Sequence, residues 1–243
     1  MPPTSWLIVG ASRGIGHEFV RQLLARGDHV YATVRNREAK HDLAYWTENA
    51  VDPTNLNTYD CNVLSENSID EFVAKLKQDT RDLQLDYVVI NAGVLKYPNV
   101  SYDDLAIHLH TNTIGPIITV QRLLAAKIPI GTLTFISSDS GSTGRFLENE
   151  DGFAAYGASK AALNQMARHM AAELKRKGSP STVICLHPGE VKTDMANIEG
   201  LGWEIEGQMT PEESVRQCIT TIMSKEQKDS GTFWTWENKP YPW

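Results

Sequence analysis

The feature that most constrains the fold is a glycine-rich turn that directly follows the first apolar run of the chain. Residues 6–9 are predicted to form a strand, Gly10-Ala11-Ser12-Arg13-Gly14-Ile15-Gly16 a turn, and residues 17–26 a helix. Glycines let the backbone turn tightly, and the new helix offers unpaired amides and a positive dipole end to an anion. The spacing differs from Gly-x-Gly-x-x-Gly and also fits an ordinary strand-to-helix turn. Its place after the first strand favours a nucleotide cradle.

Strand and helix signals alternate along the rest of the chain. Further strands are predicted at 29–34, 56–60, 85–90, 133–137, 182–186 and 232–235. Helices are predicted at 69–76, at 102–127 with an interruption at 112–116, at 154–177 and at 211–224. This alternation predicts an α/β fold, a doubly wound parallel sheet with helices on both faces. Ligands of such sheets bind at the carboxyl ends of the strands, where six candidate residues fall: Gly10, Arg35, Asp60, Asn91, Ser138 and Pro188.

Composition narrows the class of protein. A chain of 243 residues can form one α/β domain, so we expect a single domain over 1–243. The net charge of −7, with no basic stripe, argues against nucleic acid as the partner. Three dispersed cysteines imply no disulfide framework and favour a reducing, cytoplasmic location. No apolar run reaches the ~18 residues that a membrane span needs.

A metal site is not expected. Among the seven histidines only His108 and His110 are close in sequence, and a two-residue spacing on a helix points them to different faces. No third ligand lies at a usual metal-site spacing.

Tyr156 and Lys160 are candidates for acid/base chemistry. They lie one helical turn apart, which places a phenol and an ammonium on one helix face. The unperturbed phenol has a pKa near ~10, so a neighbouring cation is expected to favour its ionised form. The same pair on an amphipathic helix is also compatible with one core aromatic residue and one solvated charge.

Taken together, the motifs resemble those of the short-chain dehydrogenases/reductases over essentially the whole chain, and the C-terminal segment resembles the C-factor-like carbonyl reductases. The resemblance implies a single-domain Rossmann-type fold that binds a nicotinamide cofactor. The matching segments are Gly10 to Gly16, Asp60, Asn91-Ala92-Gly93, Asn112, Ser138, Tyr156 with Lys160, Pro188-Gly189-x-Val191-x-Thr193, and the closing Gly231-Thr-Phe-Trp with Pro242-Trp243.

The resemblance also implies a catalytic tetrad. Tyr156 is expected to donate a proton to the substrate oxygen, and Ser138 to hydrogen-bond the same oxygen. Lys160 is expected to hold the ribose hydroxyls and to lower the phenol pKa. Asn112 is expected to interrupt its helix and to place a water that links Lys160 to solvent. Without the resemblance, Ser138 also fits a turn cap and Asn112 a break caused by Gly115-Pro116.

The cofactor is expected to be NADP(H). An acidic residue at the end of the second strand selects NAD, whereas Arg35 stands there, with Arg13 in the glycine loop. Both guanidinium groups suit a 2′-phosphate, although two solvated surface arginines are the alternative. Asp60 is expected to accept from the adenine amino group. The implied cofactor-binding set is Gly10, Ser12, Arg13, Gly14, Ile15, Gly16, Arg35, Asp60, Cys61, Asn91, Ala92, Gly93, Tyr156, Lys160, Pro188, Gly189, Val191 and Thr193.

The substrate side is less constrained by the motifs. Residues 190–209 are expected to form a lid over the substrate, with Met195 and Trp203 joining Ser138 and Tyr156 in the pocket. Ser138 and Tyr156 are eighteen residues apart, more than the family usually has, because of an insertion around 145–151. We expect this insertion to border the pocket and to affect subunit contacts. By analogy a homodimer is expected, with the family's common tetramer as the alternative.

These inferences converge on an NADPH-dependent reductase of a ketone or aldehyde, a small neutral and partly hydrophobic molecule. The alternatives are an NADP-linked alcohol dehydrogenase, a reductase of C=N or C=C bonds in secondary metabolism, and a nucleotide-sensing regulator without catalysis. The sequence leaves the substrate itself open.

Overall fold

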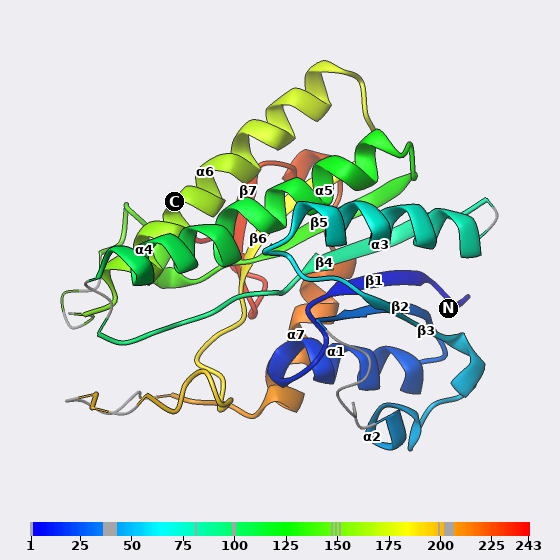
Figure 1. Ribbon diagram of the computed structural model, residues 1–243, viewed down its shortest axis with the longest axis horizontal. Helices are drawn as coiled ribbons and strands as arrows, with labels where there is room; N and C mark the ends of the chain where they lie inside the picture. Colours follow the sequence, from blue (N-terminus) through cyan, green and yellow to red (C-terminus); the bar gives the residue numbers. More distant parts are fainter. Residues whose placement is uncertain are drawn as a thin grey trace.

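The computed structural model describes residues 2–35, 43–80, 82–98, 101–146, 148, 150, 152–198, 200–201 and 207–243. Its centre is a seven-stranded sheet in the order β3-β2-β1-β4-β5-β6-β7, in which every neighbouring pair is parallel (Figure 1). The strands are β1 (Ser5–Val9), β2 (His29–Val34), β3 (Leu56–Asp60), β4 (Leu85–Ile90), β5 (Ile130–Ile136), β6 (Thr182–His187) and β7 (Thr232–Thr235). The doubly wound parallel sheet expected from the sequence is confirmed.

Helices cover both faces of the sheet (Figure 1). On one face lie α3 (Glu66–Asp79), α4 (Tyr102–Leu109), α5 (Gly115–Ala125) and α6 (Ala154–Arg176). On the other lie α1 (Gly14–Ala25), the short α2 (Leu43–Thr47) and α7 (Pro211–Met223). None of the described helices is long and apolar enough to cross a bilayer.

Two apolar clusters bind these layers together. Leu7, Val88 and Phe135 face the α3, α5 and α6 side, and are fully buried with Leu76 and Val120 from those helices. Trp6, Ile8 and Val89 alternate to the other side, where they join Phe19 of α1 and Ile219 of α7. Alternating side chains that are all apolar are the pattern of a parallel strand buried on both faces.

The structure refines several predicted bounds. α1 begins at Gly14, inside the glycine turn, because Arg13 is still extended and serves as its N-cap. β5 begins three residues earlier than predicted, at Ile130, since Leu85 of β4 pairs with that residue. The predicted interruption of helix 102–127 is a π-helical turn at His110–Ile114, which separates α4 from α5. The five-residue α2 was not predicted.

The strand order fixes where a ligand can bind. The chain moves outward from β1 to β2 and β3, then returns to place β4 on the other side of β1. The connections after β1 and β4 therefore diverge to opposite faces and leave a crevice at the carboxyl ends of these two strands. The glycine turn follows β1 and Asn91 follows β4, so both lie at this crevice.

Candidate active site

Gly10 allows the two connections at the crevice to touch. Its φ is +90°, and a Cβ atom placed on it would lie 2.7 Å from backbone atoms of Ala92. The Asn91 side-chain amide donates to the Gly10 carbonyl at 2.8 Å, and the Ala11 amide donates to the carbonyl of Thr33 at 2.8 Å. These contacts fix the glycine turn between β2 and β4, where a side chain at position 10 would separate them.

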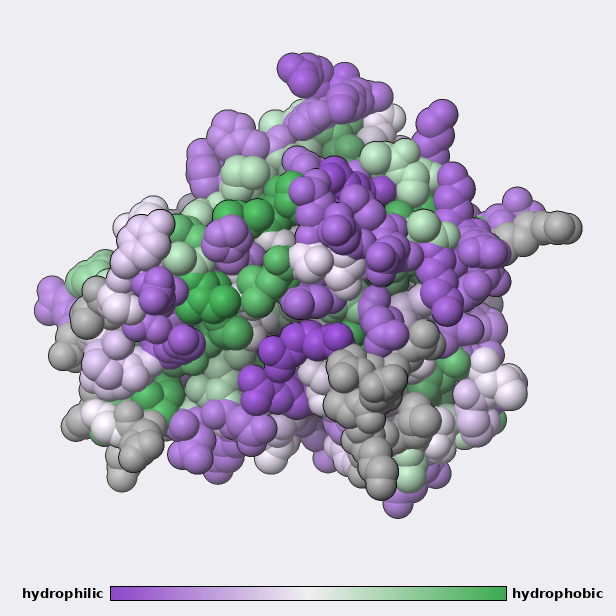
Figure 2. All heavy atoms as spheres, in the orientation of Figure 1, coloured by the Kyte–Doolittle hydropathy of each residue, from purple (hydrophilic) through white to green (hydrophobic). Residues whose placement is uncertain are grey.

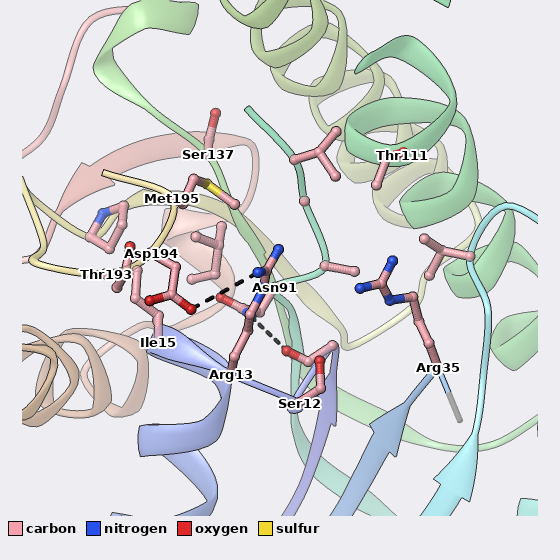
Figure 3. Close-up of a pocket in the computed structure, with 18 of the residues that line it drawn as sticks. Ser12, Arg13, Ile15, Arg35, Asn91, Thr111, Ser137, Thr193, Asp194 and Met195 are labelled. Atoms are coloured by element: carbon pink, nitrogen blue, oxygen red, sulfur yellow. Dashed lines mark hydrogen bonds and ion pairs between the residues drawn. The ribbon is translucent and has the colours of Figure 1, made fainter. Parts of the chain in front are cut away.

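The first of two adjoining cavities, here called the cofactor cleft, runs along this turn (Figure 3). Arg35 extends into it from the end of β2, and Arg13 lies at its mouth, 4.0 Å from Asp194. The described residues lining it are Gly10, Ser12, Arg13, Gly14, Ile15, Arg35, Cys61, Val63, Asn91, Ala92, Gly93, Val94, Thr111, Ile136, Ser137, Tyr156, Lys160, Pro188, Thr193, Asp194 and Met195. Most of the residues expected at the cofactor are thus brought together.

Four expected cofactor residues lie elsewhere. Asp60 is exposed at the end of β3, and the wall of the cleft near that strand is formed by Cys61 and Val63. Gly16 is buried beneath the turn, where a Cβ atom would lie 2.1 Å from the carbonyl oxygen of Gly10. Gly189 and Val191 line the second cavity instead of the cleft.

Asn112 is fully buried in the π-helical turn and joins two elements of the site. Its Oδ1 accepts from the Val94 amide at 2.8 Å, and its Nδ2 donates to the Val94 carbonyl and to the Ser159 hydroxyl, each at 2.9 Å. The side chain thereby ties the segment after β4 to α6, one residue before Lys160. The expected helix interruption is present, and within it the Asn112 side chain holds the segment after β4 against α6.

Lys160 lies on the cleft side of α6 and is 4% exposed. Its Nζ donates to the Ile136 carbonyl at 2.9 Å and lies 5.7 Å from the centre of the Tyr156 ring. Burial lowers the pKa of Lys160 to about 8, because the charged ammonium loses its hydration.

Tyr156 stands where the two cavities meet, since it lines both. Burial raises the pKa of its phenol above the ordinary value, and a hydrogen bond with Ser138 opposes this only in part. The carboxylates of Asp139, Glu190 and Glu150 raise the pKa further. Lys160 is not among the causes of this shift, since burial dominates and the ammonium is directed to a backbone carbonyl. A lowering of the phenol pKa by Lys160 stays a prediction. The Tyr156 phenol stays protonated at neutral pH.

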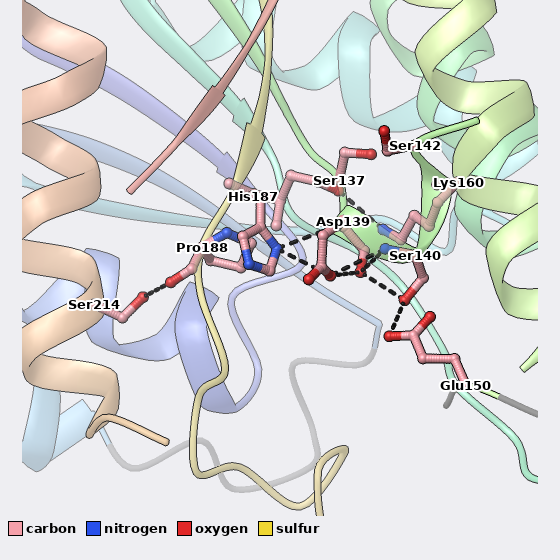
Figure 4. A network of polar contacts seen from close by, with 12 residues as sticks. Ser137, Asp139, Ser140, Ser142, Glu150, Lys160, His187, Pro188 and Ser214 are labelled. Atoms are coloured by element: carbon pink, nitrogen blue, oxygen red, sulfur yellow. Dashed lines mark hydrogen bonds and ion pairs between the residues drawn. The ribbon is translucent and has the colours of Figure 1, made fainter. Parts of the chain in front are cut away.

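Ser138 begins a polar network at the end of β5 (Figure 4). Its hydroxyl lies 3.0 Å from Asp139 Oδ1, to which it donates, and 3.2 Å from the Ser140 hydroxyl. Ser140 in turn donates to Glu150 at 3.0 Å. Asp139 Oδ1 lies 3.5 Å from Nδ1 of His187, a buried residue at the end of β6. The expected turn-cap geometry is also present, because Ser138 Oγ accepts from the Ser140 amide.

A close approach to α6 holds this network beside the phenol. A Cβ atom placed on Gly141 would lie 2.7 Å from Cβ of Lys160 and 2.8 Å from its carbonyl carbon. Asn164 of α6 also donates to the Gly141 carbonyl at 3.1 Å. The absence of a side chain at position 141 lets the turn after Ser138 pack directly against the helix that carries Tyr156.

The second cavity, here called the substrate cavity, opens from Ser138 and Tyr156. Its described lining is Ile15, Leu95, Ser137, Ser138, Ser140, Glu150, Phe153, Tyr156, His187, Pro188, Gly189, Glu190, Val191, Thr193, Met195, Ala196 and Ile198. Glu150 belongs to the insertion, which thus borders this cavity as expected. Met195 lines both cavities, whereas Trp203 lies outside the described residues. On the face shown in Figure 2, hydrophobic residues gather between α4 and the segment that follows β6.

Four polar residues of the site were missed from the sequence: Asp139, Glu150, His187 and Glu190. Asp139 and His187 directly neighbour the motif residues Ser138 and Pro188, and Glu190 fills the variable position of Pro188-Gly189-x-Val191. Ligand atoms of Asp139, His187 and Glu190 lie within 4.8 Å of one another. Their place at strand ends is the only signal that the sequence offered, because the three come from two distant segments.

Known proteins resemble the chain in both sequence and structure. A family model described as short chain dehydrogenase matches residues 5–200. An uncharacterised oxidoreductase of Schizosaccharomyces pombe is 29% identical over 98% of this chain and 97% of its own length. The NADPH-bound carbonyl reductase from chicken fatty liver superposes with a TM-score of 0.86 at 28% identity, covering 100% of both chains. A short-chain dehydrogenase/reductase of Burkholderia multivorans with bound NADP gives 0.81 at 26%, with the same coverage. Together with the crevice and its glycine turn, these matches mean that the chain belongs to the short-chain dehydrogenase family, whose members are oxidoreductases.

Proposed function

We propose that the protein is an NADPH-dependent reductase that converts a ketone or aldehyde to an alcohol. The observation that carries the proposal is the position of Tyr156, whose protonated hydroxyl stands between the cofactor cleft and the substrate cavity beside Ser138. A carbonyl oxygen that receives hydride at its carbon needs a proton donor at this place. Structural neighbours that are NADPH-bound or NADP-bound support the choice of cofactor.

The residues of the cleft suit NADP(H). Gly10, with its positive φ and no side chain, lets the glycine turn pack against Ala92, and the N-terminus of α1 after this turn favours the charge of a pyrophosphate. Arg35 and Arg13 supply two guanidinium groups for a 2′-phosphate, and the described lining at the end of β2 holds no carboxylate that would repel it. Lys160, with its Nζ in the cleft, is placed to hold ribose hydroxyls. When bound, NADPH supplies the hydride.

Residues of the protein hold and position the proton that the substrate oxygen receives. Tyr156 holds it at the hydroxyl oxygen, and burial keeps it there at neutral pH. Ser138 lies beside that hydroxyl and presents its own oxygen to the same cavity. Asn112 acts as a positioning residue, since it fixes α6 against the segment after β4. Proton transfer from a positioned side chain contributes about 10²–10⁴-fold to such reactions.

The proposal is tested with Tyr156→Phe, which removes the phenolic oxygen and keeps the ring. NADPH consumption over a panel of ketones and aldehydes is expected to fall about 10²–10⁴-fold in the variant. NADPH affinity, measured by cofactor fluorescence, is expected to stay within a few-fold of the wild type. Tight cofactor binding without turnover of any carbonyl by the wild type would instead favour the nucleotide-sensing regulator.

We also propose that the protein is a homodimer. Several large apolar side chains are exposed on α4, the π-helical turn and α6: Tyr102, Leu105, Ile114 and Met166. Tyr102 is 86% exposed, which is uncommon for an aromatic residue that has no partner surface. Light scattering that gives the mass of a monomer at working concentration would contradict this assembly.

A further inference from the structure

We propose that the carbonyl substrate carries a positive charge, such as a protonated amine or a quaternary ammonium group, within a few bonds of its carbonyl carbon. The inference rests on the proposed function, because it takes the cavity beside Tyr156 as the substrate site. It replaces the neutral compound expected from the sequence with a cationic one.

Two carboxylates, those of Glu150 and Glu190, line the cavity where the reacting carbonyl would lie, and a third, that of Asp139, is hydrogen-bonded to Ser138 in the lining. Asp139 accepts from the Ser138 hydroxyl, and Glu150 is two hydrogen bonds from Ser138, through Ser140. Glu190 lines the same cavity from the segment after β6, and its carboxylate lies within 4.8 Å of Asp139. The Glu190 carboxylate has no hydrogen bond or ion pair with the described residues, although the residue is half-buried.

Among the described residues, no lysine or arginine of the cavity lining offsets these charges. The described lining of the substrate cavity contains neither lysine nor arginine, and the basic residues Arg13, Arg35 and Lys160 line the cofactor cleft. His187 is the only described basic side chain in the cavity, and burial lowers its pKa, so it is neutral at pH 7. A neutral imidazole leaves the negative charge uncompensated.

The sequence of the two segments that border the cavity has the same bias. Residues 190–209 contain five acidic residues and one basic residue, Lys192, and residues 145–152 contain three acidic residues and one basic residue, Arg145. Lys192 is exposed, and the Arg145 guanidinium lies 5.5 Å above the ring of Tyr241. Both segments therefore have an excess of acidic residues in their sequence.

Because the carboxylates repel one another, the cavity is expected to bind a cation more tightly than a neutral molecule. Burial, then Asp139 and Glu150, raise the pKa of Glu190 to about 7, which means that its ionised form lacks both water and a counter-ion. A positively charged group placed among the three carboxylates supplies that counter-ion, whereas an anionic substrate adds to the repulsion. The remaining lining, with Leu95, Phe153 and Ile198, suits the hydrocarbon part of such a molecule.

The test compares ketones of equal shape and different charge. Trimethylammonioacetone is permanently cationic, 4,4-dimethylpentan-2-one is its neutral isostere, and levulinate is an anionic ketone. The cationic ketone is expected to show a kcat/KM at least tenfold above that of its isostere, and levulinate the lowest value. Equal or better turnover of the neutral ketone would overturn the inference and leave the proposed function intact.

Variants that remove single carboxylates identify the residues responsible for the preference for a cationic ketone. Glu190→Gln and Glu150→Gln keep the shape of each side chain and remove its charge, so the cationic-to-neutral ratio of kcat/KM is expected to fall severalfold in each and toward 1 in the double variant. Glu173→Gln, on the exposed side of α6, is the matched control and should keep the wild-type ratio. An unchanged ratio in the double variant would assign the preference elsewhere and contradict the proposal.

A binding measurement separates the inference from catalysis. Calorimetry of the protein with NADP⁺ compares 1-(trimethylammonio)propan-2-ol with 4,4-dimethylpentan-2-ol, and the charged alcohol is expected to bind at least tenfold more tightly. If no ketone is reduced, the proposed function fails, and this comparison still decides the charge preference. Tight binding of Mn²⁺ that is abolished by Glu190→Gln would mean that Asp139, His187 and Glu190 hold a metal ion, which then neutralises the carboxylates. This result would overturn the inference.

Discussion

The Ser138 hydroxyl donates to the carboxylate of its own neighbour, Asp139, at 3.0 Å. A hydroxyl has one proton, so in this arrangement Ser138 presents lone pairs, not a proton, to the substrate cavity. Polarisation of a substrate carbonyl by Ser138 then requires the proton to leave Asp139. The residue after Ser138 thus competes with the substrate for the same hydrogen bond.

Asp139→Asn is expected to weaken this competition. The amide oxygen still accepts from Ser138, but without the charge that strengthens the bond, a difference of about 1 kcal/mol or about fivefold in rate. The kcat for a neutral ketone is therefore expected to rise severalfold, as measured by NADPH consumption. Ser138→Ala in the same background should abolish the gain, and a lower kcat in Asp139→Asn would show that the carboxylate assists Ser138.

Arg35→Glu is expected to reverse the cofactor preference. Loss of a charge-assisted bond to the 2′-phosphate, of about 1.5–3 kcal/mol, should raise the KM for NADPH about tenfold or more and leave that for NADH much less affected. Arg176→Glu makes the same charge change at the end of α6, away from the cleft, and serves as the control. Equal changes in both Michaelis constants would remove Arg35 from this role.

Asn112→Ala is expected to destabilise the fold as well as to slow the reaction. The substitution removes three hydrogen bonds and leaves the half-buried backbone amide and carbonyl of Val94 without this partner, at a cost of about 2–4 kcal/mol. Chemical denaturation should show the loss, while Asn57→Ala on the exposed side of edge strand β3 should change stability by less than about 1 kcal/mol. A variant as stable as the wild type would contradict the structural role given to Asn112.

Glu190→Gln is expected to make stability less dependent on pH. The pKa of Glu190 is raised to about 7 in the folded protein from 4.5, so folding opposes its ionisation. The penalty is absent below about pH 4.5, grows as pH rises toward 7 and is complete above it. At pH 8 the variant should gain on the order of 1–3 kcal/mol over the wild type, less at pH 5. The groups that face Glu190 are Asp139, Glu150 and His187. Denaturation curves of Glu173→Gln, which removes an exposed carboxylate from α6, serve as the control. If Glu190→Gln gains no more stability over the wild type at pH 8 than at pH 5, the assignment is contradicted.

Local sequence patterns were sufficient for most of the fold. β2, β3, β4 and β7 have the predicted bounds, because each is a short apolar or β-branched run that ends at a turn residue. The start of β5 and the short α2 were not accessible in this way. The first depends on pairing with a strand 45 residues earlier in the chain, and the second is too short to show helical periodicity.

The candidate site was predictable where one motif holds the relevant residues. The glycine turn, Asn91 to Gly93, and Tyr156 with Lys160 all converge, since parallel strands end at one edge. The electrostatics were not predictable. The rise in the pKa of Tyr156 depends on burial and on three carboxylates from different segments, none of which is a helical neighbour of the phenol. The acidic character of the substrate cavity escaped the sequence for the same reason.

Glu150 reaches the cavity from an insertion whose described residues contribute no strand to the sheet, whereas the walls of the cleft include residues at the ends of β1, β2 and β4. Selection of the molecule to be reduced and delivery of reducing power therefore depend in part on different stretches of polypeptide. Exchange of one surface loop can retune which compounds enter while the reducing machinery is left undisturbed. Divergence among relatives with this architecture should accordingly concentrate in that loop.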